Sequence, residues 1–474
     1  MLHIPSNLSI YKHISAASHY TLFDVSLSLI MYAAFRIYRP TAFTILISMT
    51  TAFASYLVAE RIYERMPHLE DEIAYTWQAA VYAKGQLTIP SPQYPHSFMV
   101  PFIVDYREQR FAKYPPGWPA LLALGITFGI RAWVNPLLAG LAVWLTYRLG
   151  QKLLGSTAGV LAALLTATSP LFLIYAASLM AHTWSLVLTL IFSVSWLDTF
   201  GHSDRRVRPT DDQYSLVSTS HVEYSYPSLI TVLVAGLSLG DLALTRPLTA
   251  LGVALAFFIH GLILWRRGDN QVRRRVLSIG VIAGCIGALL LVWQFAVTGS
   301  LWLNPYTLWW KYDNVGFGAE IGRFPGGHNL QHAWINLKSS LKLVIHDLFG
   351  WGKISWLFLP IGIWAIRRNY RSWLVVAIPF GLVVVYLAYW ASHGARYYYE
   401  GLPGLILTTS AGMLSLLGWS EHNRVSWYQL RSLLTFLLFF GLVGYDVLNF
   451  LPHRLNELYH RYNIDRSQWE EYGG

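Results

Sequence analysis

The chain has 474 residues, of which 54% are hydrophobic and 13% charged, with a mean hydropathy of +0.39 and a formal net charge of +10. A soluble domain has about 25% charged residues, so this composition excludes a soluble globular protein. It predicts an all-α, polytopic membrane protein, and the high aromatic content suits interfacial belts. The single cysteine, Cys285, excludes a disulfide within the chain.

The predicted elements begin with a mixed segment, 1–40, which we expect to be cytoplasmic or interfacial. A transmembrane domain over 41–447 follows, and its first span is expected to act as an uncleaved anchor. A membrane span needs about 20 apolar residues, and the sequence predicts about eleven transmembrane helices. They are 41–60, 134–149, 157–174, 183–198, 228–243, 247–265, 276–297, 353–366, 373–391, 402–418 and 430–447. A further apolar stretch, 116–130, is interpreted as re-entrant or interfacial.

The charge distribution predicts an orientation. With the N-terminus in the cytoplasm, the inner segments hold 18 Lys and Arg against 8 Asp and Glu, and the rest of the chain holds 17 of each. This is the positive-inside pattern of a multi-pass protein of the plasma (inner) membrane. It accounts for the basic charge without nucleic acid as a partner. Two large outer loops, 61–133 and 298–352, and an outer tail, 448–474, follow from this orientation.

Three consecutive acids, Glu70, Asp71 and Glu72, open the first outer loop in "MPHLEDEIAYTWQA". The apolar periodicity after Asp71 predicts a helix lying on the membrane, with the acids at its N-terminal end. One reading is structural, because acids at a helix N-terminus cap free N–H groups and complement the dipole. The other is catalytic, and it requires a substrate held beside the bilayer.

Three cations on the outer side could hold such a substrate. Lys113 precedes the rigid turn in "FAKYPPGWP", Arg246 lies in the tight turn "LTRPL", and Arg396 lies in "GARYYYEGLP". Each alone is explained by snorkelling to lipid head groups. Together with the acidic loop they predict a pocket for an anionic lipid head group, because Lys and Arg both bind phosphate.

Several further residues are expected to contact substrates. His182 begins a span on the outer side, although a lone histidine there is more often an interfacial hydrogen-bonding residue. His328 belongs to an outer loop rich in glycine and aromatic residues, which either covers a cleft or is simply packed. The full set of expected substrate-binding residues is Tyr75, Tyr114, His182, His328 and Tyr397.

Taken in their order along the chain, the motifs resemble those of the C-type (GT-C) integral-membrane glycosyltransferases. "DEIAYTWQA" is similar to their Asp-Glu motif, "KYPPGWPALLALG" to their Lys-Pro-Pro segment, and "GARYYYEGLP" to a late Arg-Tyr motif. The resemblance covers roughly 41–418 and is strongest to glycosyltransferase family 39-like enzymes, such as protein O-mannosyltransferases and lipid A aminoarabinose transferases. It implies a GT-C-like fold whose large first outer loop carries juxtamembrane helices.

The resemblance implies an inverting glycosyltransferase that moves a sugar from a polyprenyl-phosphate donor to a hydroxyl acceptor on the outer face. Asp71 would be the general base, with Glu72 beside it, while Lys113 and Arg396, with Arg246, would bind the donor phosphate. The acceptor would be a protein, a lipid or a glycan. No cofactor is certain. Some relatives carry an Asp near the position of His182, so this sequence assigns no metal ligand, and a divalent cation remains open.

Two alternatives belong to other classes. A transporter or flippase for a lipid-linked sugar should carry ionisable groups at mid-membrane depth and broken helices in related halves, whereas the ionisable groups here gather at the outer ends of spans. A polysaccharide polymerase or ligase would also use lipid-linked substrates. The Asp-Glu pair directly after the first span favours the transferase.

Overall fold

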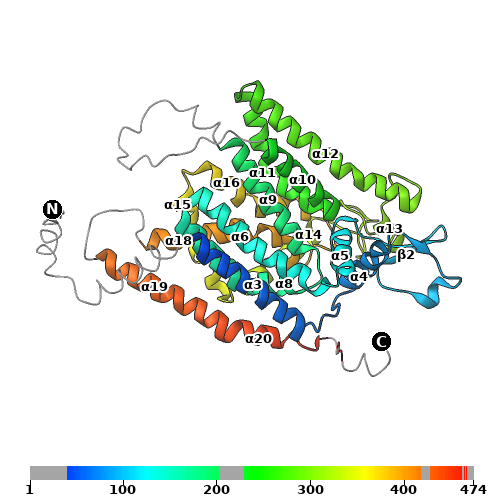
Figure 1. Cartoon of the computed structure of the whole chain (residues 1–474), viewed down its shortest axis with the longest axis horizontal. Helices are drawn as coiled ribbons and strands as arrows, with labels where there is room; N and C mark the ends of the chain where they lie inside the picture. Colours follow the sequence, from blue (N-terminus) through cyan, green and yellow to red (C-terminus); the bar gives the residue numbers. More distant parts are fainter. Residues whose placement is uncertain (1–39, 202–228, 418–426, 462–463, 465, 467–474) are drawn as a thin grey trace, which may run out of the picture.

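The computed structural model describes residues 40–201, 229–417, 427–461, 464 and 466. The expected N-terminal segment up to residue 39, much of the inner loop after residue 201, and most of the tail beyond residue 461 lie outside the described residues. Within the described part the chain is mostly helical, and its elements run from α3 to α20 in Figure 1.

Five helical stretches of the described chain are long and apolar enough to cross a membrane. They are α3 (Pro40–Arg61), α9 (His182–Phe200), α11 (Pro247–Arg267), α12 (Asn270–Thr298) and the stretch Leu434–Asn456, which runs through α19 (Trp427–Tyr445), the π-turn η6 (Asp446–Phe450) and α20 (Leu451–Asn456). Two bent pairs raise the number to seven if each pair is one span. The total of about eleven stays a prediction.

The first bent pair joins α7 (Ser156–Thr168) to α8 (Pro170–Ala177) with a bend of 60°. The break follows from Ser169 and Pro170, because proline cannot donate a backbone hydrogen bond and is suited to the first turn of a new helix. The Ser169 hydroxyl accepts from the N–H of Phe172 and so caps α8. The second pair bends by 96° between α14 (Leu330–Asp347) and the stretch 352–366, which comprises η4 (Gly352–Trp356) and α15 (Phe358–Ile366).

The remaining helices are shorter or less apolar and complete the bundle. They are α6 (Val134–Leu154), α10 (Leu229–Thr245), α13 (Pro305–Trp309), α16 (Tyr370–Val376), α17 (Ile378–Tyr386), η5 (Ala395–Gly401) and α18 (Leu402–Leu416). The buried side chains of α6, α7, α9, α10, α11, α17 and α18 form one continuous apolar core.

The segment between α3 and α6 is a compact unit. It contains α4 (Glu70–Ala83), a three-stranded sheet of β1 (Ile89–Pro90), β2 (Ile103–Tyr106) and β3 (Gln109–Ala112), the turn η1 (Pro95–Phe98), α5 (Gly117–Thr127) and η2 (Arg131–Trp133). β3 is the central strand and pairs antiparallel with both neighbours. The all-α prediction missed this sheet because its strands are short and because the two residues between β2 and β3, Arg107 and Glu108, have positive φ without the Gly, Asn or Asp that usually signals such a turn.

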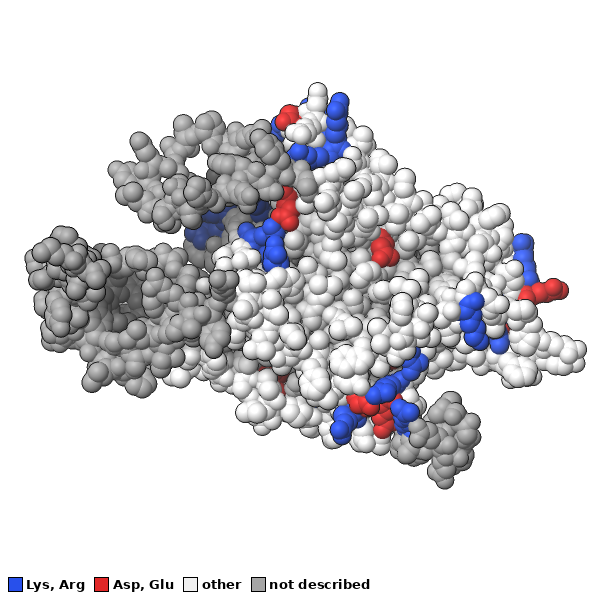
Figure 2. Space-filling view, viewed as in Figure 1, with Lys and Arg blue, Asp and Glu red and all other residues white. Residues whose placement is uncertain are grey.

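The small sheet, α4, α5 and α13 gather at one end of the helical bundle (Figure 1). On the face in Figure 2, charged side chains of the described residues gather towards the margins, and a broad, mostly uncharged area lies between them. Such a distribution is that of a protein whose central zone contacts lipid.

Candidate active site

Helix α4 carries the three acids at its first turn, and their side chains have different environments. Glu72 is buried and accepts hydrogen bonds from the backbone N–H groups of His68 (2.6 Å) and Leu69 (3.2 Å), which supplies the carboxylate half of a capping box, since Leu69 has no side-chain acceptor to return it. Its other oxygen accepts from the N–H of Leu179 at 2.9 Å. Burial raises the pKa of Glu72 to about 7, opposed by these backbone donors. Glu72 therefore joins α4 to the turn before α9.

Asp71 lies at a junction between distant parts of the chain. Its Oδ1 accepts a hydrogen bond from the Tyr114 hydroxyl, and its Oδ2 accepts one from Arg396 Nη1 at 3.2 Å. The side chains of Asp71 and Arg396 keep 22% and 25% of their surface exposed, so a ligand can reach both. The structure thus brings together the Asp-Glu motif, the tyrosine of "KYPPG" and the arginine of "GARYYYEG".

The position of Tyr114 follows from two contacts of the preceding strand and the following helix. Gln78 of α4 accepts from the N–H of Ala112 at 2.7 Å and donates to the carbonyl of Leu87 at 3.0 Å, which fixes the end of β3 against α4. Gly117 starts α5 against the end of α10, where a Cβ atom would overlap Thr245 Oγ1. The close approach allowed by this glycine sets "KYPPG" beside "LTRPL".

Lys113 lies beside this junction, and its charge has a partner within the protein. Its Nζ lies 3.0 Å from Asp313 Oδ2, and both side chains are buried. Aromatic rings surround the ammonium, with the centroids of Phe102, Trp310 and Tyr306 at 4.1, 4.7 and 4.9 Å. Burial lowers the pKa of Lys113 and Asp313 counteracts this. The pair joins the segment after β3 to the loop after α13.

Asp313 also accepts from Trp390 Nε1 at 3.1 Å and from the Tyr389 hydroxyl at 3.3 Å through its Oδ1. Asp313 is not among the site residues expected from the sequence. Its signal was an acid that follows aromatic residues in "WWKYDN", within a loop rich in glycine and aromatic residues.

Arg246 lies in the turn between α10 and α11 and is also paired inside the protein. Its Nη1 donates to Glu400 Oε1 at 2.5 Å and its Nη2 to the Tyr386 hydroxyl at 3.1 Å. Glu400 is fully buried and was likewise not selected from the sequence, although it follows the tyrosines of the Arg-Tyr motif. This pair fixes η5, which carries Arg396, to the start of α11.

Tyrosines cover the remaining sides of the junction. The ring of Tyr75 lies 4.6 Å from that of Tyr114. The hydroxyl of Tyr397 lies 3.5 Å from Arg396 Nη2, and its ring packs 5.1 Å from Tyr386. Both predicted tyrosines therefore lie beside the Asp71–Arg396 pair or its immediate neighbours.

The two histidines have other surroundings. His328 stacks on Phe317 at 5.1 Å, and its Nε2 contacts the carbonyl of Leu387 at 2.9 Å, so it anchors its own loop to the end of α17. His182 is buried between Tyr175 and Tyr399, with centroid distances of 5.4 and 6.2 Å. Neither ring nitrogen of His182 has a hydrogen-bond partner among the described residues.

Within the described ranges, no group of three or more His, Cys, Asp or Glu side chains is arranged to hold a metal ion. The described side chains therefore indicate no ligand set for a divalent cation.

No protein-family model matches the sequence, and no curated protein matches it. At the level of structure the chain is similar to ArnT from Cupriavidus metallidurans bound to undecaprenyl phosphate, with a TM-score of 0.51 and 14% identity over 88% of this chain and 74% of ArnT. The apo state of the same protein gives a TM-score of 0.51 at 12% identity.

The chain is also similar to the oligosaccharyltransferase of Archaeoglobus fulgidus in the apo form, with a TM-score of 0.50 and 12% identity over 85% of this chain. It spans about half the length of that enzyme, covering 55% of it. At these identities the similarities show a shared fold. The GT-C-like fold implied by the sequence motifs is therefore confirmed at the level of the fold.

Proposed function

We propose that the protein is an inverting glycosyltransferase that moves a sugar from a polyprenyl-phosphate donor to a hydroxyl acceptor. The observation that carries the proposal is the contact between Asp71 and Arg396 at a partly exposed junction. It sets a carboxylate that can take a proton beside a guanidinium that can bind a phosphate. The fold shared with a transferase and with ArnT, a protein solved with undecaprenyl phosphate, supports this assignment.

In the proposed reaction the acceptor oxygen attacks the anomeric carbon of the sugar from the face opposite the phosphate. The bond between that carbon and the phosphate oxygen breaks, and the polyprenyl phosphate leaves with the electron pair. Asp71 takes the hydroxyl proton, and Arg396 stabilises the charge of the leaving phosphate. A single displacement inverts the anomeric configuration.

The ion pairs within the protein indicate which of the three cations is available to bind the donor phosphate. Lys113 and Arg246 already face the buried carboxylates of Asp313 and Glu400, whereas Arg396 is shared with an accessible one. We therefore assign the donor phosphate first to Arg396, with Lys113 and Arg246 acting by holding the loops around it. When the phosphate binds Arg396, it competes with Asp71 for the guanidinium and frees the carboxylate to accept a proton.

The proposal extends to family and placement. We assign the chain to the glycosyltransferase family 39-like enzymes, with its transmembrane domain over 41–447, its N-terminus in the cytoplasm and the Asp71 junction on the outer face of the plasma (inner) membrane. The positive-inside distribution of the sequence supports this orientation. The acceptor is a protein, lipid or glycan.

A direct test uses the purified full chain in lipid nanodiscs with a panel of polyprenyl-phosphate sugars and candidate hydroxyl acceptors. The proposal predicts acceptor-dependent loss of one donor, with release of polyprenyl phosphate and an inverted product. Movement of intact donor between leaflets without cleavage would instead identify a flippase.

A further inference from the structure

A small cavity lies apart from the Asp71 junction, where the end of α3, the start of α6 and the turn before α9 meet. It has a volume of about 20 Å³, so its enclosed part has room for about one water-sized group. The residues that line it include Tyr63, Arg65, Arg131, Asn135 and Ser178. None of these residues takes part in the proposed transfer.

Two arginines flank this cavity. Arg131 Nη2 donates to the backbone carbonyl of Arg65 at 2.9 Å. Arg65 pairs with Glu60 and donates to the Tyr56 hydroxyl at 2.9 Å. No carboxylate lies within ion-pair distance of Arg131 among the residues that the structure describes. Burial and the neighbouring charge of Arg65 lower the pKa of Arg131. Among the described residues, one positive charge at the cavity is therefore uncompensated.

Asn135 adds an acceptor that also needs a partner. Its Nδ2 donates to the carbonyls of Ser178 at 2.5 Å and Met180 at 3.0 Å, and these two bonds fix the orientation of the amide. Its Oδ1 is buried and has no hydrogen-bond partner among the described residues. A buried acceptor of this kind is costly unless a donor reaches it.

We propose that this cavity binds a phosphodiester that carries a hydroxyl, as in the glycerophosphate head group of an anionic phospholipid. The phosphate lies at the mouth, where Arg131 neutralises it beside Arg65, because the enclosed volume is too small for it. The hydroxyl enters and donates to Asn135 Oδ1. A choline group has no donor and is too large, and an ethanolamine group would add an ammonium beside two arginines.

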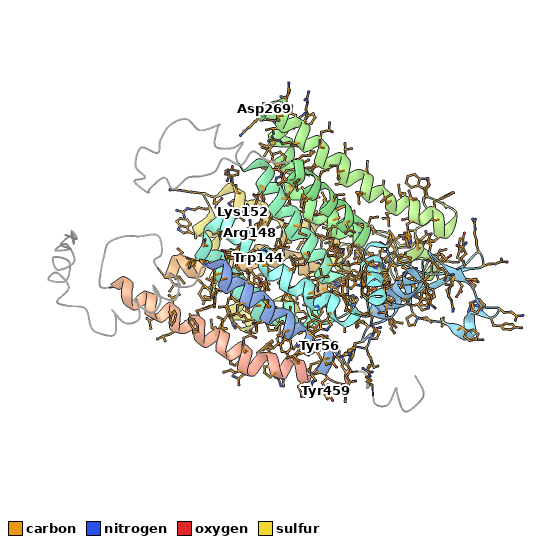
Figure 3. The ribbon with its side chains drawn as sticks, viewed as in Figure 1. Tyr56, Trp144, Arg148, Lys152, Asp269 and Tyr459 are labelled. Atoms are coloured by element: carbon orange, nitrogen blue, oxygen red, sulfur yellow. The ribbon has the colours of Figure 1, made fainter. Side chains whose placement is uncertain are left out.

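The location suits a lipid. The cavity adjoins the end of α3, which is long and apolar enough to cross a membrane. Tyr56 of this helix stacks on Trp133 with ring centroids 3.8 Å apart, and Tyr and Trp are the residues enriched at membrane–water interfaces. Figure 3 shows Tyr56 near the end of α3, well away from Arg148 and Lys152 on α6.

The test measures lipids retained by the purified full chain. Wild type, Arg131→Gln and Lys84→Gln are reconstituted in nanodiscs of phosphatidylcholine with or without phosphatidylglycerol, and bound lipid is counted by native mass spectrometry. Lys84 is an exposed cation at the end of α4 and serves as the matched control. A second arm offers soluble glycerophosphoglycerol, a phosphodiester with free hydroxyl groups, to lipid-free protein in detergent.

We expect wild type and Lys84→Gln to retain phosphatidylglycerol over phosphatidylcholine, and Arg131→Gln to retain about tenfold less, because a charge-assisted hydrogen bond is lost. Binding of the soluble ester without lipid would assign the same site to a free phosphate ester. Equal retention of both lipids by wild type, or wild-type retention by Arg131→Gln, overturns the proposal. If Arg131→Gln does not fold, the proposal is tested by the lipid retention of Arg131→Lys and by the preference of the wild type for phosphatidylglycerol over phosphatidylcholine. The outcome is independent of the sugar-transfer assay.

Discussion

Asp71 and Arg396 are 325 positions apart in the sequence and are joined by a hydrogen bond of 3.2 Å. Asp71 lies in the first turn of the helix that follows the first predicted span, and Arg396 belongs to the turn that precedes α18. Their contact requires the intervening helices to bring the two motifs to the same end of the bundle. The contact places the proposed base directly beside the proposed phosphate ligand, and substitutions of each residue lead to distinct predictions.

The first prediction concerns Arg396. Arg396→Gln should raise the donor KM and lower kcat, because the lost guanidinium both binds the phosphate and stabilises it as a leaving group. Arg396→Lys should recover part of the activity, since it keeps the charge but not the fork. Steady-state kinetics with a polyprenyl-phosphate sugar measure both. Arg323→Gln, which removes an exposed arginine of the loop after α13, is the control. Unchanged constants in Arg396→Gln would place the phosphate elsewhere.

The second prediction concerns the Lys113–Asp313 pair. Lys113→Met or Asp313→Asn should lower stability by about 3–5 kcal/mol, because each leaves a buried charge without its partner. The double variant should be more stable than either single variant. Thermal unfolding in detergent, followed by intrinsic fluorescence, measures this. A Lys113→Met protein as stable as wild type that no longer binds donor would make Lys113 a phosphate ligand instead.

The third prediction concerns pH. The pKa of Glu72 is raised to about 7 in the folded chain from the ordinary glutamate value of 4.5. The folded chain therefore keeps a proton that the unfolded chain releases between these values, and stability should fall as the pH rises through this window. Thermal midpoints at several pH values measure the slope.

Glu72→Gln should be less stable overall, because its amide cannot accept all three backbone hydrogen bonds. It should nevertheless lose the part of the pH slope that comes from Glu72. Glu108→Gln, which changes an exposed acid, should keep the slope. The same slope in Glu72→Gln and wild type would show that another group titrates.

The fourth prediction concerns Gly117. A methyl group at this position would meet Thr245 Oγ1 and lie 3.0 Å from the carbonyl oxygen of Leu244. Gly117→Ala should therefore move α5 away from α10, displace Tyr114 from Asp71 and reduce kcat. Gly284→Ala, at a glycine of α12 with no positive φ and no atom near its Cβ position, separates the effect of the added methyl group itself from the close approach. Full activity in Gly117→Ala would mean that this approach does not position Tyr114.

The sequence was informative where a motif is local. Its order of acids, "KYPPG" and the Arg-Tyr segment predicted the fold, and the residues Asp71, Tyr114 and Arg396 do meet in the structure. The partners of Lys113 and Arg246 could not be predicted in this way. These partners lie 200 and 154 positions away in the sequence, respectively, and neither periodicity nor charge counts predict contacts over such distances.

The different roles of the three acids could not be predicted from the sequence either. Charge alone could not distinguish their roles, because all three lie in the first turn of one helix. The turn before α9 supplies a backbone donor to Glu72, while Glu70 stays exposed and Asp71 faces Tyr114 and Arg396. The distinction depends on which neighbouring segment each side chain meets.

In the proposed reaction Asp71 acts as the general base, and a single substitution tests this role. The most direct measurement compares wild type, Asp71→Asn and Glu70→Gln for acceptor-dependent cleavage of a polyprenyl-phosphate sugar, with folding checked by thermal unfolding. We expect Glu70→Gln to turn over like wild type. Asp71→Asn should fold and bind donor but lose activity by about 100-fold or more, the usual contribution of a positioned base. Turnover of Asp71→Asn at the rate of Glu70→Gln would show that Asp71 is not the base.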